Sequence, residues 1–172
     1  MITRLNHAVL FVRDVERSAA FYVNVLGFRR LPMDVGFDAA FLQAPGSTND
    51  HDLGLFGIGS AAQPFPAGRS SVGLYHLAWE VDTLEALGRL ERALADSGAL
   101  VGASDHGTTK SVYGRDPDGL QFELAWIVPA DRLTEDALDA RSRIGRLDLA
   151  REQARYGSAT PGGVGISHST HP

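Results

Sequence analysis

The sequence predicts an α+β protein built from two βαβββ modules, and three observations support this fold class. The order of one strand, one helix and three short strands occurs twice, with a period of about 70 residues. A histidine occupies the third position of each opening strand, as His7 in "LNH" and His76 in "LYH". Residues 59–71 separate the two copies and have the Gly-, Ala-, Ser- and Pro-rich composition of a linker.

The first module is expected at about residues 3–60. Its predicted elements, in chain order, are a strand over 5–12, a helix over 13–27 and strands over 28–35, 37–46 and 51–58. The helix prediction rests on apolar residues at helical spacing, namely Val15, Ala19, Tyr22, Val23 and Leu26. Gly27 follows them and suits a left-handed C-terminal position, so the helix is expected to end there.

The second module is expected at about residues 72–129. Its predicted elements are a strand over 74–81, a helix over 82–98 and strands over 99–104, 110–116 and 120–128. The helix carries one apolar stripe, made of Leu84, Leu87, Leu90 and Leu94. Asp116, Pro117, Asp118 and Gly119 are expected to form a tight turn between the last two strands.

The histidine in the strand over 74–81 lies on a face where an aliphatic residue would be expected. Alternation predicts a core face made of Tyr75, Leu77, Trp79 and Val81. The opposite face then holds Leu74, His76, Ala78 and Glu80. A single strand histidine is most often structural, but His7 and His76 at equivalent repeat positions favour a shared function.

The last strand of the second module places a carboxylate on the face opposite the core. Glu123 alternates with the apolar set Leu120, Phe122, Leu124 and Trp126. An ionised carboxylate among apolar positions must be paired or bound to a metal. If the two modules pair about a pseudo-two-fold axis, His7, His76 and Glu123 can converge on one cavity, and two imidazoles with one carboxylate are the ligand set of non-haem Fe(II) oxygenases.

A simpler interpretation of Glu123 is an ion pair with Arg69, Lys110 or Arg115, which would leave both histidines unexplained. Tyr113 is separated from Glu123 by ten residues across the turn, so antiparallel neighbours can place both side chains on one face.

Composition restricts the classes of function and partner. The chain has 172 residues, 44% of them hydrophobic and 22% charged, with a net charge of −5, which argues against nucleic-acid and anionic-membrane partners. There is no cysteine, so a metal would be held by His, Asp and Glu, which suits Fe(II), Mn(II), Ni(II) or Zn(II). No apolar run approaches a membrane span and "MITRLNHAVLFV" lacks signal-peptide features, so a cytoplasmic protein is expected.

Residues 5–128 resemble the vicinal oxygen chelate superfamily, which includes glyoxalases, fosfomycin-resistance proteins, bleomycin-binding proteins and extradiol dioxygenases. "LNHAVLFVRDVERSAAFYVNVLGF" is similar to a typical module opening of that superfamily. "SDHGTTKSVYGRDPDGLQFELAW" resembles the segment of catechol-type extradiol dioxygenases that carries an active-site His, a Tyr, an Asp-Pro-x-Gly turn and the metal-binding Glu. The resemblance implies a curled mixed sheet around a metal cavity.

The same resemblance assigns roles to individual residues. It makes His7, His76 and Glu123 the metal ligands, and it makes His106 and Tyr113 catalytic residues beside the metal. Extradiol enzymes often carry a further acid/base histidine shortly before the second metal histidine, but no histidine lies between His51 and His76. Either His106 and Tyr113 move protons alone, or the chemistry differs from that of these enzymes. Without the resemblance, Tyr113 is interpreted equally well as a buried tyrosine bonded to a carbonyl.

One position separates the branches of the superfamily. Glyoxalase-like members take a fourth ligand, usually Glu, from the last strand of the first module, where this chain has Gly54 in "DLGLF". A three-ligand site with open positions suits dioxygen chemistry better than the four-ligand site of a glyoxalase does. His51 is near in sequence but belongs to the "STNDHD" turn, and it is expected to be a surface histidine.

The resulting expectation is an Fe(II)-dependent extradiol-type dioxygenase that uses O₂ to cleave a catechol-like small aromatic, in a pocket for which Phe11, Phe41 and Phe56 are candidate lining residues. Two alternatives stay open. One is another metal-dependent member, a glyoxalase-like lyase or isomerase, and the other is a non-enzymatic protein that sequesters an aromatic drug.

Residues 130–172 extend beyond the domain expected at 1–129. Residues 131–157 are predicted to form a helix with Thr134 as N-cap and with a loose apolar stripe of Leu138, Ile144, Leu147 and Ala154. This helix is expected to pack across the second module or against a partner subunit of a homo-oligomer.

The final residues, 158–172, have a disordered composition. His168 and His171 are expected to belong to a flexible tail rather than to a metal site.

Overall fold

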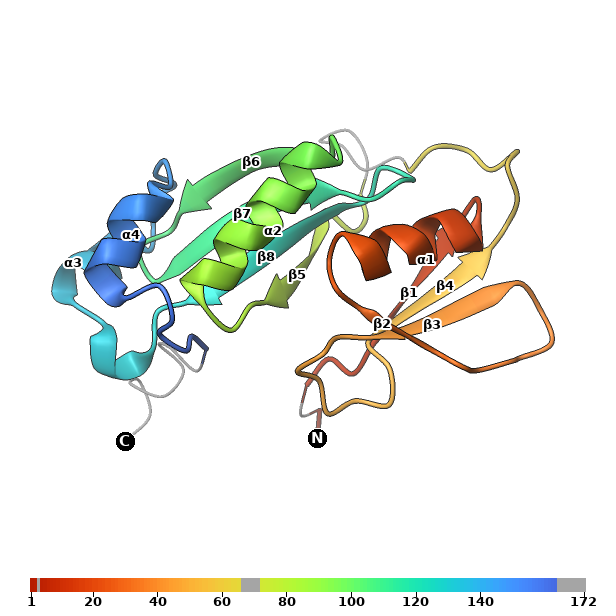
Figure 1. Ribbon diagram of the computed structural model, residues 1–172, viewed down its shortest axis with the longest axis horizontal. Coiled ribbons are helices and arrows are strands. Elements are labelled where there is room, and N and C mark those ends of the chain that lie inside the picture. Colours follow the sequence, from red (N-terminus) through yellow and green to blue (C-terminus); the bar gives the residue numbers. More distant parts are fainter. Residues whose placement is uncertain (3, 66–71, 164–172) are drawn as a thin grey trace. The chain divides into compact units, whose positions relative to one another are not determined.

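The computed structural model describes residues 1–2, 4–65 and 72–163. The chain divides into two compact units. The first contains Met1–Ser71 and Asp116–Leu120, and the second contains Val72–Arg115 and Gln121–Pro172. Each unit has a four-stranded mixed sheet with a helix packed on it (Figure 1), so the predicted α+β class with two βαβββ modules is confirmed.

The first sheet has the strand order β1-β4-β3-β2. Its elements are β1 (Ala8–Val12), α1 (Val15–Asn24), β2 (Arg29–Leu31), β3 (Ala39–Gln43) and β4 (Leu53–Gly57). β1 runs parallel to β4, and the remaining pairs are antiparallel. Helix α1 begins where the Asp14 carboxylate accepts the backbone N–H of Arg17, and it buries its apolar side against β3 and β4.

The second sheet repeats this arrangement in the order β5-β8-β7-β6. Its elements are β5 (His76–Glu80), α2 (Leu84–Asp96), β6 (Leu100–Asp105), β7 (Thr109–Arg115) and β8 (Gln121–Ile127). Thr83 caps α2 by accepting the backbone N–H of Ala86, and Leu84, Leu87 and Leu94 are fully buried beneath the helix.

Both helices end as the sequence predicts. Gly27 and Gly98 have φ values of 80° and 72°, which is the left-handed conformation that a side chain disfavours and that glycine adopts without strain. Asp116 and Gly119 close the predicted turn, since the backbone N–H of Gly119 donates to the carbonyl of Asp116 at 3.0 Å.

The opening strand of each module is shorter than predicted. β1 begins at Ala8, so His7 lies just outside the strand and is exposed. β5 begins at His76, and Tyr75, expected on a core face, is 65% exposed. Leu77 and Trp79 are half-buried, so this face is less enclosed than alternation suggested. The pairing with the neighbouring strand decides these boundaries, because the ladder begins at Ala8 and at His76.

The segment after β8 differs most from its prediction. In place of one helix over 131–157, the structure has η1 (Ala130–Arg132), α3 (Glu135–Ala140) and α4 (Leu149–Tyr156). Thr134 is the N-cap of α3, as predicted. The expected apolar stripe is wrong, because Ile144 is 79% exposed, and the buried residues of α3 and α4 are Ala137, Glu152 and Tyr156.

Residues 158–163, expected to be disordered, pack along the second unit. Thr160 accepts a hydrogen bond from the indole Nε1 of Trp126 at 3.2 Å, and the backbone N–H groups of Gly162 and Gly163 donate to Asp82 and Ile127. These bonds satisfy backbone groups that would be hydrogen-bonded to water if the segment were disordered, as its composition suggested. His168 and His171 lie outside the described residues.

Among the described residues, no helix has both the length and the apolar character needed to cross a bilayer.

Candidate functional site

His76 and Glu123 meet on one face of the second sheet. β5 runs parallel to β8 in a register that pairs His76 with Gln121 and Ala78 with Glu123. The two side chains are therefore two residues apart along neighbouring strands and share a face. Because Ala78 has only a methyl group, the carboxylate of Glu123 can extend along the sheet to His76, and Nε2 of His76 lies 3.1 Å from Oε2 of Glu123.

The partners of both side chains show that this pair is incompletely satisfied within the unit. Ser111 on β7 donates its hydroxyl to Oε1 of Glu123 at 2.5 Å, which orients the carboxylate. Nδ1 of His76 is buried and has no hydrogen-bond partner within the part of the chain that the structure describes. A buried imidazole nitrogen without a partner is costly, so His76 does not fit the interpretation of a satisfied structural histidine.

Tyr113 lies beside this pair. It is the direct antiparallel partner of Glu123, as the ten-residue spacing predicted, and its ring centroid is 6.1 Å from that of His76. Burial raises the pKa of Tyr113, and the nearby Glu123 carboxylate raises it further, against the smaller effect of hydrogen bonds with Ser111 and Ser104. The phenol is therefore protonated at neutral pH and available as a hydrogen-bond donor.

His106 contacts this group through Tyr113. It lies in the short turn between β6 and β7, and its Nε2 is 2.9 Å from the Tyr113 hydroxyl. Its ring is half-buried, unlike most loop histidines. The structure therefore brings four of the five predicted site residues onto one unit, as two adjacent pairs, His76 with Glu123 and His106 with Tyr113.

The fifth predicted residue, His7, belongs to the first unit. Its ring lies 4.4 Å from the ring of His51, and the ring of His51 lies 5.1 Å from that of Phe41. The expectation that His51 is a surface histidine is wrong, because its side chain is only 16% exposed and is held between two other rings. The chain from Asp50 to Leu53 brings it there, since Leu53 pairs with Ala8, next to His7.

Gly54 lies on the same face of the first sheet as Val9, its β1 partner. A β-carbon added at Gly54 would meet a Val9 methyl at 3.3 Å, so a larger residue there would require Val9 to move. This close approach gives Gly54 a packing role in addition to the absence of a ligating side chain.

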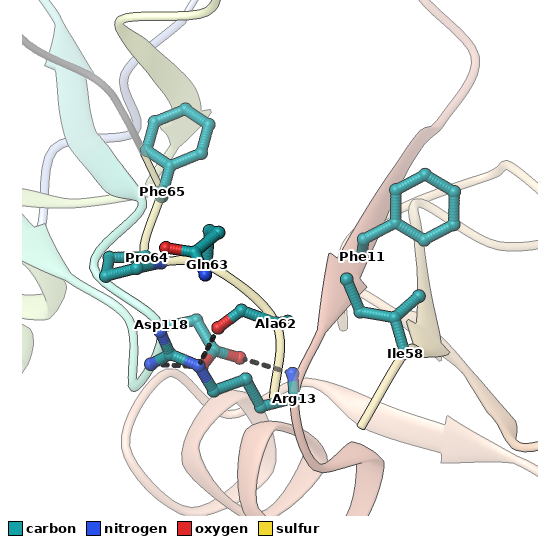
Figure 2. Close-up of a pocket in the computed structure, with 8 residues that line it drawn as sticks. All are labelled: Phe11, Arg13, Ile58, Ala62, Gln63, Pro64, Phe65 and Asp118. Carbon is teal, nitrogen blue, oxygen red and sulfur yellow. Dashed lines mark hydrogen bonds and ion pairs between the residues drawn. The ribbon is translucent and has the colours of Figure 1, made fainter. Parts of the chain in front are cut away.

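A pocket of about 380 Å³ is present in the first unit (Figure 2). Phe11 is one of its lining residues, whereas Phe41 and Phe56 pack against each other with ring centroids 6.1 Å apart and do not line it. Arg13 lies at the pocket wall, where Nε donates to the carbonyl of Ala62 and the guanidinium pairs with Asp118 at 3.7 Å.

The donor set of the second unit fits part of the ligand set of the metal that the resemblance implies. Two donor atoms in adjacent positions of an octahedral ion, with bonds of about 2.1 Å, are separated by about 3.0 Å. The 3.1 Å between Nε2 of His76 and Oε2 of Glu123 is compatible with that separation, and it is also an ordinary hydrogen-bond distance. No group of three or more potential ligands (His, Cys, Asp or Glu) is found within residues 1–2, 4–65 and 72–163. The second unit thus fits two of the three expected ligands.

The cations suggested as alternative partners of Glu123 behave differently from one another. Lys110 is buried but pairs with Asp105 and Glu152 instead. Arg115 is exposed at the end of β7. Arg69 lies outside the described residues.

Two residues that contact the expected ligands were missed by sequence reasoning. Ser111 shares strand parity with Tyr113, so its place on the Glu123 face was readable, but its hydrogen bond to Glu123 runs diagonally across the ladder. His51 carried no local signal, because its contact with His7 depends on pairing between β1 and β4.

Comparisons with known proteins agree with this fold. The chain matches the family model of the Glyoxalase/Bleomycin resistance protein/Dioxygenase superfamily over residues 4–124. It is 34% identical over 122 residues to the catechol-2,3-dioxygenase of Bacillus subtilis, covering 71% of this chain and 41% of that protein. It is also 34% identical over 128 residues to a lactoylglutathione lyase of Neisseria meningitidis, covering 70% of this chain and 88% of that protein.

Solved structures show the same architecture. A glyoxalase/dioxygenase from Nostoc punctiforme superimposes with a TM-score of 0.56 and 26% identity, covering 71% of this chain and 89% of that one. A glyoxylase/bleomycin resistance protein/dioxygenase domain from Frankia sp. EAN1pec has a TM-score of 0.59 at 24% identity, over 73% of this chain and 92% of the other. This chain therefore belongs to the Glyoxalase/Bleomycin resistance protein/Dioxygenase superfamily.

Proposed function

We propose that this protein is an Fe(II)-dependent extradiol-type dioxygenase that cleaves the ring of a catechol-like small aromatic. The observation that carries the proposal is the adjacency of two pairs, His76 with Glu123 on one face of the second sheet and His106 of the neighbouring turn with Tyr113. The first pair offers metal ligands, and the second offers groups that can donate and accept protons. The 34% identity with a catechol-2,3-dioxygenase supports this choice, although the chain spans only 41% of that relative's length.

In this proposal His7, His76 and Glu123 hold the metal. Two imidazoles and one carboxylate leave ligand positions open, which is the donor set of non-haem Fe(II) oxygenases and favours Fe(II) over Mn(II), Ni(II) or Zn(II). When bound, Fe(II) supplies Lewis acidity toward the two substrate oxygens and the electronic coupling between substrate and O₂. Ser111 keeps the Glu123 carboxylate in one orientation through its hydrogen bond.

The remaining work is proton transfer. Extradiol cleavage breaks the ring C–C bond beside the diol and adds one oxygen atom of O₂ to each of the two carbons that this bond joined. A diol proton is removed before this step and returned to the product afterwards. An imidazole can accept and return a proton near neutral pH, which suits His106. The Tyr113 phenol, kept protonated by burial and by Glu123, donates a hydrogen bond to a substrate oxygen and relays protons with His106 across their 2.9 Å contact.

The test is O₂ consumption by protein purified without oxygen and loaded with Fe(II). An oxygen electrode would follow uptake with a panel of catechols, hydroquinones and substituted forms, and metal analysis of the same sample would give the iron content. We expect uptake with at least one catechol and a ring-cleaved product. No uptake, combined with tight binding of an aromatic ligand, would instead favour a sequestering protein.

A glyoxalase-like lyase or isomerase is the second candidate, and one observation favours it. His51 lies against His7, so the first unit offers a second imidazole although Gly54 offers no ligand. The chain also spans 88% of the lactoylglutathione lyase of Neisseria meningitidis. His51→Ala separates the two candidates. If the protein is a dioxygenase with three ligands, the variant should keep the metal affinity of the wild type. If it is a lyase with His51 as a fourth ligand, the variant should bind the metal less tightly.

A further inference from the structure

The turn that carries His106 is held by the part of the chain that follows the family domain. The family match ends at residue 124, whereas α3 and α4 lie beyond it. Asp105 and Gly145 form two backbone hydrogen bonds, with the N–H of Asp105 donating at 2.9 Å and the N–H of Gly145 donating at 2.8 Å. This bridge interrupts the helix expected over 131–157 and fixes one end of the His106 turn.

The other end of the turn is closed by α3. Gly107 has a φ of 73°, and a β-carbon placed there would lie 2.3 Å from the carbonyl oxygen of Ala137 and 2.8 Å from the side chain of Ala140. The helix therefore sits directly on the turn, and only glycine fits between them.

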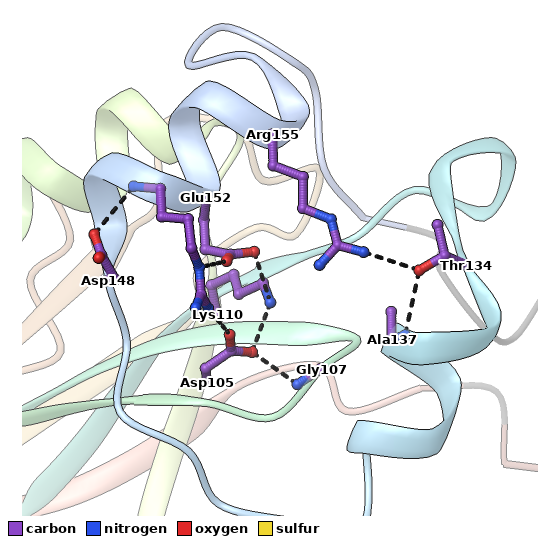
Figure 3. A network of polar contacts seen from close by, with 9 residues as sticks. Asp105, Gly107, Lys110, Thr134, Ala137, Asp148, Glu152 and Arg155 are labelled. Atoms are coloured by element: carbon purple, nitrogen blue, oxygen red, sulfur yellow. Dashed lines mark hydrogen bonds and ion pairs between the residues drawn. The ribbon is translucent and has the colours of Figure 1, made fainter.

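A buried network of charges joins the same turn to α4 (Figure 3). Lys110 is 1% exposed, and its Nζ lies 2.6 Å from Asp105 and 3.0 Å from Glu152, which is itself fully buried. Asp105 also accepts the backbone N–H of Gly107 at 2.8 Å, and Arg151 pairs with Glu152 at 2.9 Å. Each of these buried side chains has a partner of opposite formal charge, and such pairing offsets part of the cost of burying a charge.

These contacts do not reach the proposed site directly. Lys110 alternates with Ser111 along β7, so its side chain points to the opposite face of the sheet from Ser111 and Tyr113. Its effect on His106 passes through the turn, where the backbone N–H of His106 donates to the carbonyl of Thr109 at 2.9 Å. The position of the His106 ring, 2.9 Å from the Tyr113 hydroxyl, depends on that turn.

We propose that Glu152 and Lys110 are positioning residues for the hydrogen bond between His106 and Tyr113. The segment over 130–163 then contributes to the site by holding the turn that carries His106. The proposal rests on the proposed function in assigning that hydrogen bond to catalysis. The structural part, that α4 holds the turn through Glu152, is measurable without any substrate.

The experiment compares Glu152→Gln in the full chain with Leu94→Ala as a control. Glu152→Gln keeps the shape of the side chain and removes its charge. Leu94 is also fully buried in the second unit, on α2, and it packs beside Gly114 rather than on the turn. Urea unfolding gives the free energy of unfolding that each variant loses relative to the wild type. The control therefore shows how far a loss of global stability alone changes the other measurements.

Amide hydrogen exchange and NMR measure the opening of the turn and the environment of the His106 ring. We expect Glu152→Gln to speed amide exchange at His106 and Thr108 by about 10-fold or more, since the openings that expose these amides become more frequent. The ¹⁵N signals of the His106 ring should shift toward those of a Tyr113→Phe variant, which lacks the hydrogen bond. Leu94→Ala should speed exchange at these amides by no more than its loss of global stability requires, and it should leave the His106 ring signals as in the wild type. Unchanged exchange and ring signals in Glu152→Gln would overturn the proposal.

Kinetics test the catalytic part. If the wild type consumes O₂ with a catechol, Glu152→Gln should lower kcat by about 10-fold or more with KM within about 2-fold, because misplacement of a proton-transfer group affects the transition state. An unchanged kcat would overturn the positioning role even if the turn loosens. If the wild type shows no turnover, the proposed function fails by that result, and exchange and ring signals alone decide whether Glu152 holds the His106–Tyr113 bond.

Discussion

Nε2 of His76 lies 3.1 Å from Oε2 of Glu123, although the two residues face different partners in the strand ladder. Glu123 is paired with Ala78, and His76 is paired with Gln121. The contact is diagonal across parallel strands and requires the small side chain at Ala78. It sets two donor atoms at the separation that adjacent ligands of one metal ion have, and the predictions about metal binding depend on it.

We predict that the protein binds one divalent ion per chain and that His76→Ala abolishes this stoichiometric binding. Removing the imidazole takes away one of three proposed ligands and leaves the Glu123 carboxylate its hydrogen bond with Ser111. Metal analysis after dialysis and calorimetric titration with Fe(II) under nitrogen would measure the change. The thermal stabilisation that metal gives the wild type should disappear as well.

His7→Ala is the matched variant in the first unit and should show the same loss. His106→Phe is the control, because it removes a histidine that is not a proposed ligand. Full metal occupancy in His76→Ala would remove His76 from the ligand set.

We predict that His106→Phe and Tyr113→Phe keep the metal and lose turnover. Both side chains lie beside the ligand pair without being ligands, and their 2.9 Å hydrogen bond is suited to proton transfer. Loss of a general acid or base lowers kcat by roughly 10²-fold or more. Metal content and O₂ uptake, measured on the same samples, separate the two effects. Wild-type kcat in both variants would show that protons move by another route.

We predict that Ser111→Ala weakens metal binding by roughly 10- to 100-fold, the usual effect of removing a group that orients a ligand. The Ser111 hydroxyl donates to Oε1 of Glu123, and Ser111 is fully buried. Competition with a chelator of known affinity would measure the change.

Ser104→Ala is the control for this variant, because Ser104 lies across the ladder from Ser111 and interacts with Tyr113. Equal losses in the two variants would mean that the Ser111–Glu123 bond has no specific role.

We predict that the first unit loses stability at alkaline pH because the phenol of Tyr22 is harder to ionise in the folded protein than in the unfolded chain. Tyr22 is 1% exposed, and burial, followed by the Asp116 carboxylate 3.2 Å from its hydroxyl, raises the pKa of the phenol well above 10. A raised pKa means that the stabilisation is complete below the unfolded pKa of about 10 and is lost as the pH rises toward the folded pKa. The free energy of unfolding should fall by about 1.4 kcal/mol per pH unit from this group above about pH 10.

Urea unfolding of the wild type and Tyr22→Phe between about pH 8 and about pH 11 tests this. The advantage of the wild type over Tyr22→Phe should shrink as the pH rises, because phenylalanine has no proton to lose. A constant difference over that range would contradict the prediction.

The sequence by itself determined the features that depend on local periodicity. Alternation every two residues placed Glu123 and Tyr113 on one face, and the structure pairs them directly. Helical spacing identified the buried faces of α1 and α2, and Gly27 and Gly98 marked their ends. Such patterns are readable because the geometry of one strand or helix repeats within a few residues and needs no partner.

The tertiary structure decided the contacts that join different elements. The register of β5 against β8 set the His76–Glu123 distance, and the pairing of β1 with β4 brought His51 to His7. An N-cap and a loose apolar stripe predicted one helix over 131–157, whereas the structure has separate short helices there and a bridge between Asp105 and Gly145 in the gap between α3 and α4. Periodicity also assigned the C-terminal core to apolar residues. The buried positions include Glu152, because a charged side chain can be buried when another element supplies a partner of opposite charge. Here the partner is Lys110 on β7. The sequence around either residue does not predict this pairing.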